Sequence, residues 1–304
     1  MARAQERALR FAWARGRVIE GHRVLDAHVH LQPSAQMLPA VKATFESGRR
    51  DVERIRGFER SPEAFLAHLD EEGIDAAALI SYVSPRVMGY RPDSNDAVAA
   101  FARGRPRLIP MGGVHPDATP DVRAEAERLL GLGVRAFKVH PAHMLLYPND
   151  ERLRPLYEIA QERRVPVTIH TGTSVFPGAK NRFTDPMFVD DVAVDFPGLT
   201  ILLAHAGRPL WYETAFFLAR RHANLLLEVS GIPPARLLEV LPRLPEIDHK
   251  VVWGSDWPSM GVKSLRANVE QLLSLPLADA AKGRILWENG ARAFGMGVSG
   301  GKAP

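Results

Sequence analysis

Cysteine is absent from the 304-residue sequence. The chain therefore forms no disulfide, holds no iron–sulfur cluster or thiolate-bound metal, and uses no cysteine nucleophile. A metal ion bound by this protein must have histidine and carboxylate ligands instead. Long apolar runs are absent as well, since none approaches the ~18 residues that cross a bilayer. We therefore expect no membrane partner.

The N-terminal residues lack the apolar core of a secretory signal peptide. They are rich in arginine and poor in acidic residues, a composition that also occurs in transit peptides. We expect residues 1–23 to form an amphipathic helical extension, with a transit peptide as the alternative. The expected location is the cytoplasm.

Motifs for nucleotides and nucleic acids are missing too. The sequence has no Gly-rich phosphate loop, no G-x-G-x-x-G after a strand and no G-x-S-x-G nucleophile elbow. Lys and Arg number 39 against 35 Asp and Glu, and the resulting charge of +4 is spread along the chain. This pattern argues against a nucleic-acid partner and favours a small-molecule substrate.

The sequence does contain eight short apolar runs bounded by Gly or Pro. Such runs are typical of parallel strands buried on both faces. Between them, Ser61, Thr119 and Asp185 each precede a proline, as N-cap residues often do, and Gly73 and Gly131 stand where helices would end. The eight runs are residues 24–30, 74–82, 108–116, 134–142, 165–172, 199–207, 223–231 and 250–258.

Eight strand–helix repeats without an internal linker predict an α/β protein with a single (β/α)₈ TIM barrel. We expect this catalytic barrel to occupy residues 24–294, between the 1–23 extension and a flexible tail of residues 295–304. The long connection 31–60 would lie over the barrel mouth, either as a lid or substrate clamp or as a solvated insertion. This connection contains Arg49, Arg50, Arg54, Arg56 and Arg60.

Polar residues close four of the apolar runs. His28 and His30 are two apart on the first run, so they point to the same side of a strand. His170, His205 and Asp256 close the fifth, sixth and eighth runs. In a closed barrel these ends meet at one mouth, where a shared cation would satisfy groups that are costly to bury unpaired.

The order of these motifs resembles the amidohydrolase superfamily. The motifs are H-x-H at residues 28–30, then His170, then H-x-G at residues 205–207, and G-S-D-x-P at residues 254–258. The resemblance is greatest to the branch that includes aminocarboxymuconate-semialdehyde decarboxylase and resorcylate decarboxylase. It covers nearly the whole chain, from Val24 to the last predicted helix. Only 23 residues precede the first strand, too few for the extra β-sandwich of many amidohydrolases.

The resemblance implies one catalytic divalent metal, with Zn²⁺ expected and Mn²⁺ or Fe²⁺ as alternatives. His28, His30, His170 and Asp256 match the positions of the family's metal ligands. His205 matches a non-ligand or second-metal histidine, and we expect it to act as general acid/base. Asp256 would also accept a proton from the attacking water.

Further residues are candidates for a second metal or for substrate contact. Lys138 matches the position of a carboxylated lysine in two-metal amidohydrolases, or it pairs with a buried carboxylate such as Glu228. His140 and His115 close the fourth and third runs, and Arg208 would bind a substrate carboxylate or form a rim salt bridge. We expect His22, His68, His222 and His249 at the surface, and Trp211 and Trp257 in packing roles.

The leading hypothesis is a hydrolase in which metal-activated water attacks the carbonyl of an amide, ester or lactone. The alternative is a metal-dependent non-oxidative decarboxylase of an aromatic or muconate-like acid. It would be favoured if Arg208 and arginines of residues 49–60 line the pocket. A non-catalytic binding protein is a third reading, although no ligand position is substituted. A homodimer is expected.

Overall fold

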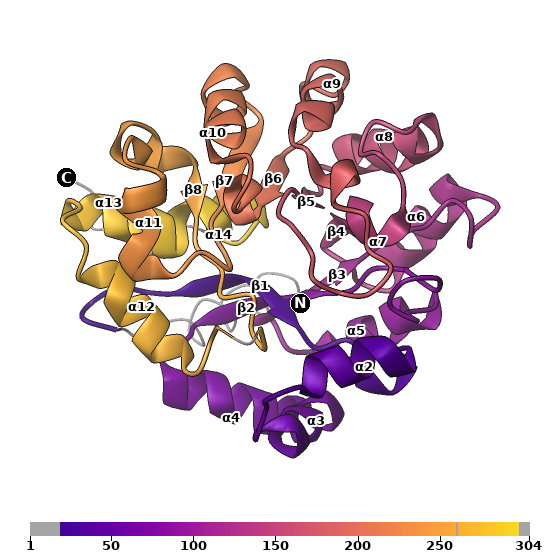
Figure 1. The fold of residues 1–304 in the computed structure, drawn as a ribbon, viewed down its shortest axis with the longest axis horizontal. Helices are drawn as coiled ribbons and strands as arrows, with labels where there is room; N and C mark the ends of the chain where they lie inside the picture. The colour runs from indigo at the N-terminus through magenta and orange to yellow at the C-terminus, as the bar shows by residue number, and fades with distance from the viewer. Residues whose placement is uncertain (1–18, 260, 298–304) are drawn as a thin grey trace, which may run out of the picture.

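The computed structural model describes residues 19–259 and 261–297. Eight parallel strands form one sheet in chain order, each hydrogen-bonded to the next (Figure 1). Each strand lies within one of the eight predicted runs. The strands are β1 (Leu25–His30), β2 (Ala76–Ile80), β3 (Leu108–Gly112), β4 (Ala136–Val139), β5 (Val167–His170), β6 (Ile201–Ala204), β7 (Leu225–Glu228) and β8 (Val251–Val252).

The sheet closes between β1 and the residues that follow β8. The backbone N–H of His30 donates to the carbonyl of Trp257 at 2.8 Å, and that of Asp256 donates to the carbonyl of His28 at 2.9 Å. Val29 and Trp257 also pair as a parallel bridge. The predicted (β/α)₈ TIM barrel is therefore confirmed, and the described residues contain no second domain.

Helices connect the strands and surround the sheet (Figure 1). The chain closes with a π-helical turn at Arg284–Glu288 that runs into the last helix. The helices are α2 (Pro39–Glu46), α3 (Val52–Arg60), α4 (Pro62–Glu72), α5 (Asp93–Ala102), α6 (Val122–Gly131), α7 (Pro141–Met144), α8 (Arg154–Glu162), α9 (Met187–Asp195), α10 (Tyr212–Arg221), α11 (Leu237–Val240), α12 (Leu265–Leu273), α13 (Asp279–Gly283) and α14 (Asn289–Ala293).

The predicted helix boundaries are partly right. Ser61 accepts a hydrogen bond from the backbone of Ala64 and caps α4, which ends at the left-handed Gly73 as expected. Thr119 does not cap α6, because the cap is Asp121, whose side chain accepts from the backbone of Ala124. Gly131 is the last helical residue of α6 rather than a residue beyond its end.

Alternation along the strands separates the barrel interior from the layer beneath the helices. Phe137 and Val139 of β4 pack in the large apolar cluster beneath the helices, while Lys138 between them is fully buried away from that cluster. The same period places His28 and His30 of β1 on one side of the strand, so both side chains face the barrel mouth. Sequence spacing thus determines which polar residues reach the site.

The ends of the chain lie largely outside the described residues. Residues 1–18 of the predicted helical extension and residues 298–304 of the predicted tail are not described. Ile19 and His22 form a short antiparallel bridge, and Met296 is buried, so packing extends to that residue. No helix in the described residues is long and apolar enough to cross a membrane.

Candidate active site

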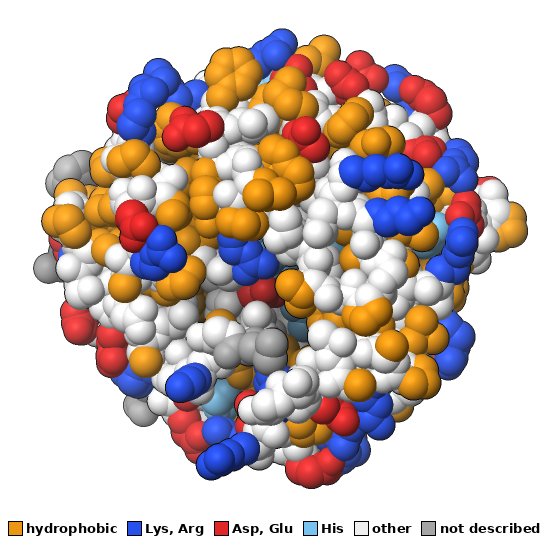
Figure 2. Space-filling model, viewed as in Figure 1, with side chains coloured by type: hydrophobic (Ala, Val, Ile, Leu, Met, Phe, Trp, Pro, Cys, Tyr) orange, Lys and Arg blue, Asp and Glu red, His pale blue; other side chains and the backbone are white. Residues whose placement is uncertain are grey.

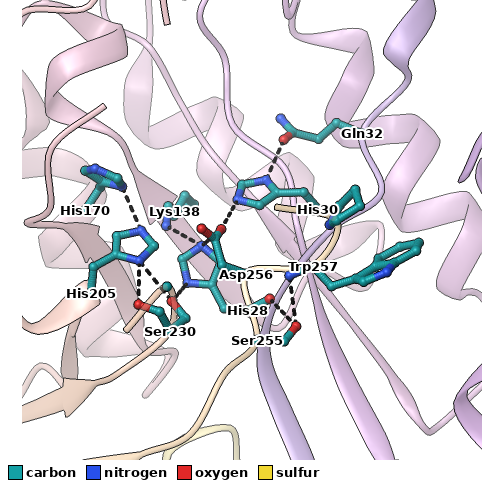
Figure 3. Close-up of polar contacts among 12 residues, drawn as sticks. His28, His30, Gln32, Lys138, His170, His205, Ser230, Ser255, Asp256 and Trp257 are labelled. Atoms are coloured by element: carbon teal, nitrogen blue, oxygen red, sulfur yellow. Dashed lines mark hydrogen bonds and ion pairs between the residues drawn. The ribbon is translucent and has the colours of Figure 1, made fainter. Parts of the chain in front are cut away.

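Three side chains meet at the barrel mouth, two from β1 and one from the residues that follow β8 (Figure 3). Oδ1 of Asp256 lies 3.5 Å from Nε2 of His28 and 3.4 Å from Nε2 of His30. His28 is fully buried, whereas His30 is partly open to the pocket. Among the described residues, these three form one of two groups whose ligand atoms lie close enough to share a metal ion.

The hydrogen bonds around the two histidines leave their Nε2 atoms without protons. His28 Nδ1 lies 2.6 Å from Glu228 Oε2, and His30 Nδ1 lies 3.1 Å from Gln32 Oε1. Because these oxygens accept, Nδ1 of each ring carries the proton. Two imidazole lone pairs therefore converge on the Asp256 carboxylate. A cation is the species that satisfies three such acceptors at once.

Local backbone shape aims the remaining groups at the same point. Asp256 and His205 have positive φ angles of 65° and 68°, which non-glycine residues rarely adopt and which often occur at functional sites. Gly254 lies so close to its neighbours that a Cβ atom there would sit 2.6 Å from Glu228 and 2.8 Å from His28. A larger residue would push these groups apart.

Ser230 connects the second group of potential ligands, which consists of His28, His205 and Glu228. Its hydroxyl donates to Glu228 at 2.8 Å and lies 3.0 Å from His205 Nδ1. The Ser230 carbonyl accepts from His205 Nδ1 at 3.0 Å. His205 therefore keeps its lone pair on Nε2.

His170 lies beside His205 and outside both groups of three. Its Nδ1 is 3.0 Å from His205 Nε2, and its own Nε2 is buried without a hydrogen-bond partner. The ligand role of His170 remains a prediction. An unpartnered buried nitrogen at this point fits a group that still requires a ligand of its own.

Lys138 lies beneath the site. Its ammonium is 3.3 Å from His28 Nε2 (Figure 3). Burial lowers the pKa of Lys138 to about 8 and raises the pKa of Glu228 to about 7, although each group opposes the shift of the other. The hydrogen-bond partners of Glu228 are His28 and Ser230 rather than Lys138.

The protonation states suit a divalent cation. Burial lowers the pKa of His28, His170 and His205 well below the ordinary value, so these rings are neutral at pH 7. Burial opposes the ionisation of Asp256, yet its polar surroundings, which include the charge of Arg208, outweigh it and hold the pKa of Asp256 below its usual value. Neutral imidazoles with one carboxylate fit Zn²⁺, Mn²⁺ or Fe²⁺.

A pocket of about 200 Å³ opens from this cluster to the surface. Figure 2 shows the face hollowed near its centre, with histidine side chains visible inside. The volume is below the roughly 300–1,000 Å³ typical of pockets for drug-sized ligands, so it suits a small molecule. Apolar walls come from Phe45, Met37, Met88 and Phe176.

The connection 31–60 reaches this pocket. It folds into α2 and α3, and both Phe45 and Arg49 line the cavity. Arg49 is only 7% exposed, pairs with Asp51 at 3.3 Å and donates to the carbonyl of Pro258, while its buried Nε has no partner. Arg208 also lines the pocket and donates to the carbonyl of Gly231 at 2.8 Å. The other arginines of this connection do not border the cavity.

Sequence reasoning missed His143, which lines the pocket from α7. Its ring stacks on His140 at 3.5 Å, and His140 stacks on His170 at 3.8 Å. Tyr82 contacts His143 Nδ1 at 2.9 Å, and Ser174 contacts its Nε2 at 2.7 Å. No strand-end signal marks His143, but its spacing of three from His140 places both on one side of a helical turn.

Two predicted positions turn out differently or lie elsewhere, and a third is as expected. His115 is buried and accepts a hydrogen bond from the backbone of Asp117, outside the pocket lining. The predicted surface position of His68 is wrong, because His68 is buried and its ring stacks on Phe58 with the centroids 4.7 Å apart. Trp257 packs against the same aromatic group, as predicted.

The sequence model of the amidohydrolase family matches residues 25–296. The chain belongs to the amidohydrolase family. This amidohydrolase matches no curated protein sequence. Many solved structures share its fold, and three of them are described below.

An uncharacterised TIM-barrel protein from Bordetella bronchiseptica is 25% identical, with a TM-score of 0.71, over 90% of this chain and 98% of that one. The 5-carboxyvanillate decarboxylase from Novosphingobium aromaticivorans, complexed with manganese and 4-hydroxy-3-methoxy-5-nitrobenzoic acid, is 18% identical. Its TM-score is 0.67 over 91% of this chain and 97% of that one. The 4-oxalomesaconate hydratase from Rhodopseudomonas palustris is 19% identical, with a TM-score of 0.61 over 90% of this chain and 95% of that one.

Proposed function

We propose that this amidohydrolase is a metal-dependent decarboxylase of a small aromatic or muconate-like acid. The observation that carries this proposal is the presence of two arginines, Arg49 and Arg208, in a largely apolar pocket beside the histidine and aspartate cluster. Arg49 already pairs with the Asp51 carboxylate, but its buried Nε has no partner, and a planar substrate carboxylate suits such a donor best.

His28, His30 and Asp256 would hold the metal, with His170 as the predicted fourth ligand. A bound divalent cation supplies a Lewis acid at the head of the pocket. Zn²⁺ is the metal we propose, although a manganese complex is recorded for one decarboxylase of the same fold. The other pocket residues orient the substrate and exclude water.

Decarboxylation breaks the bond between the carboxylate and its neighbouring carbon, whose electron pair stays on the substrate. Carbon dioxide leaves, and a proton from solvent takes its place on that carbon. His205 is the candidate for relaying this proton from solvent, because it lines the pocket and its Nε2 lone pair, fixed by the contact of Nδ1 with the Ser230 carbonyl, can take up a proton and pass it on. Arg49 and Arg208 would hold the substrate's carboxylate groups while this exchange occurs.

Hydrolysis of an amide, ester or lactone is the second candidate. Asp256 favours it, because this carboxylate is ionised at pH 7 and lines the pocket, where it can contact an attacking water. The ligand set serves either reaction. The two functions differ in their products, since only the decarboxylase releases carbon dioxide.

The test uses metal-loaded protein and two panels of compounds, one of ¹³C-carboxyl-labelled benzoates and muconates and one of esters, amides and lactones. We expect ¹³CO₂ from the first panel, detected by mass spectrometry. Arg49→Gln should lower kcat/KM about 10- to 100-fold through the loss of a charged hydrogen bond. Arg50→Gln is the matched control, because Arg50 is its exposed neighbour. Turnover of the second panel without ¹³CO₂ release would instead establish the hydrolase.

A further inference from the structure

Two polar atoms at the pocket wall have no role in the cluster described above. Tyr90 is 3% exposed and lines the pocket, and its hydroxyl makes no hydrogen bond to any described residue. Glu59 of α3 lines the pocket as well. Its Oε2 accepts from the backbone and hydroxyl of Ser34 at 3.2 and 2.8 Å, while its Oε1 has no partner among the described side chains.

These two groups lie apart from the histidines. The Tyr82 ring contacts rings of both sets, because its centroid lies 5.1 Å from that of His140 and 5.6 Å from that of Tyr90. Neither Glu59 nor Tyr90 shares a hydrogen bond, ion pair or ring contact with any described histidine. A ligand held at the metal cluster would therefore meet Tyr90 and Glu59 with a different part of its structure.

Glu59 forms no ion pair with a described cation, although the charges of Arg56 and Arg60 act on it from nearby. Arg56 is the basic residue one turn before it on α3, and its ion pairs are with Glu46 and Glu53 instead. Burial raises the pKa of Glu59, and burial together with Glu59 raises the pKa of Tyr90. An acceptor in this position is stabilised by a partner that brings a hydrogen-bond donor.

We propose that Glu59 and Tyr90 form a donor-selecting subsite, which recognises a hydroxyl or amino substituent on the part of the substrate away from its reacting carboxylate. The inference rests on the proposed function, because it assumes an acid in this pocket. Glu59 would accept from the substituent, and the Tyr90 hydroxyl would complete the contact by donating or accepting. Methyl ethers of the same compounds would lack the donor and bind less well.

The experiment measures dissociation constants by isothermal titration with the metal-loaded protein. The probes are benzoate, the 3- and 4-hydroxybenzoates, the corresponding aminobenzoates and the corresponding methoxybenzoates. We expect the best hydroxy or amino compound to bind about tenfold tighter than its methoxy partner, as for a hydrogen bond to a charged acceptor. Tyr90→Phe and Glu59→Gln should each reduce this preference to roughly threefold or less, with benzoate affinity unchanged.

Glu53→Gln is the matched control, because Glu53 lies on the same helix with its side chain 77% exposed. It should keep the full preference. Benzoate binding without preference for donors would overturn the subsite and leave the acid pocket intact. Failure of every acid to bind would overturn both proposals. If thermal melting shows that Glu59→Gln is unfolded, Tyr90→Phe decides the matter, since it removes only one oxygen.

Discussion

Ser230 is a small side chain that contacts much of the candidate centre. Its hydroxyl reaches His28, His205 and Glu228, and its carbonyl fixes the tautomer of His205. Partners of this kind orient metal ligands and proton carriers without touching the substrate. The sequence shows Ser230 only as a polar residue after an apolar strand, so its importance comes from the three elements that meet there.

We expect Ser230→Ala to lower kcat/KM about 10- to 100-fold, because Glu228 loses a donor and His205 loses a fixed neighbour. Steady-state kinetics on the metal-loaded protein measure this effect. Ser274→Ala is the control, since that hydroxyl bonds only to a carbonyl of its own helix. Unchanged kinetics in Ser230→Ala would mean that Ser230 has no positioning role.

His68 allows a pH prediction away from the metal cluster. Burial lowers its pKa below the ordinary value of 6.5, so the folded protein holds His68 neutral and the unfolded chain binds the proton more readily. Its contribution to stability is present above pH 6.5 and is lost as the pH falls through its folded pKa. We expect the wild type to lose more free energy of unfolding between pH 7 and pH 5 than His68→Phe does. Urea unfolding at both pH values measures this difference, and equal losses would contradict the prediction.

Individual residues were predictable where a simple spacing governs them. His28, His30 and Asp256 were found because alternate strand residues share a side and strand ends share a mouth. His143 and Tyr82 escaped prediction because they lie on connections, where their direction depends on tertiary contacts. His68 was misplaced because the sequence does not show that α3 covers α4 with an aromatic side chain.

At the scale of elements, the connection 31–60 was ambiguous and the structure gives it two helices. Only Arg49 of its five predicted arginines borders the pocket; Arg50, Arg54 and Arg60 are exposed, and Arg56 pairs with Glu46 and Glu53. The strands were predictable to within a few residues. β8 is much shorter than its run of residues 250–258, since the residues after Val252 hydrogen-bond to β1 with irregular backbone, including the positive φ of Asp256.

The cap of α4 gives a prediction at this scale. Ser61→Ala removes the hydrogen bond to the Ala64 backbone and should lower the free energy of unfolding by about 1 kcal/mol. Chemical denaturation measures this change. Ser47→Ala is the control, because Ser47 caps the end of α2 through its backbone N–H and not through its side chain. A loss of stability as large in Ser47→Ala would contradict the capping role.

At the scale of the whole molecule, the barrel brings together residues 200 positions apart, as the 2.6 Å contact between His28 and Glu228 shows. The spacing of apolar runs predicted this closure because eight strand–helix units complete one turn. The homodimer stays a prediction. Light scattering during size-exclusion chromatography measures it, and a single mass of 33.6 kDa would contradict it.

Metal binding should stabilise the whole barrel, since its ligands come from both ends of the sheet. At a free concentration one hundred times Kd, a metal adds about 2.7 kcal/mol to the free energy of unfolding. We expect chelation to lower Tm by on the order of 5 °C, and resupply of Zn²⁺ to restore it. A Tm that is independent of chelator would show that no ion links these strands.

The most direct measurement is a crystal structure of the metal-loaded protein with anomalous scattering recorded at the metal edge. We expect one strong peak within about 2.0–2.3 Å of His28, His30, His170 and Asp256. Crystals of His170→Ala and Asp256→Ala should lose that peak, while His249→Ala should keep it. A peak elsewhere in the molecule, or none at all in metal-loaded wild-type crystals, would contradict the proposed centre.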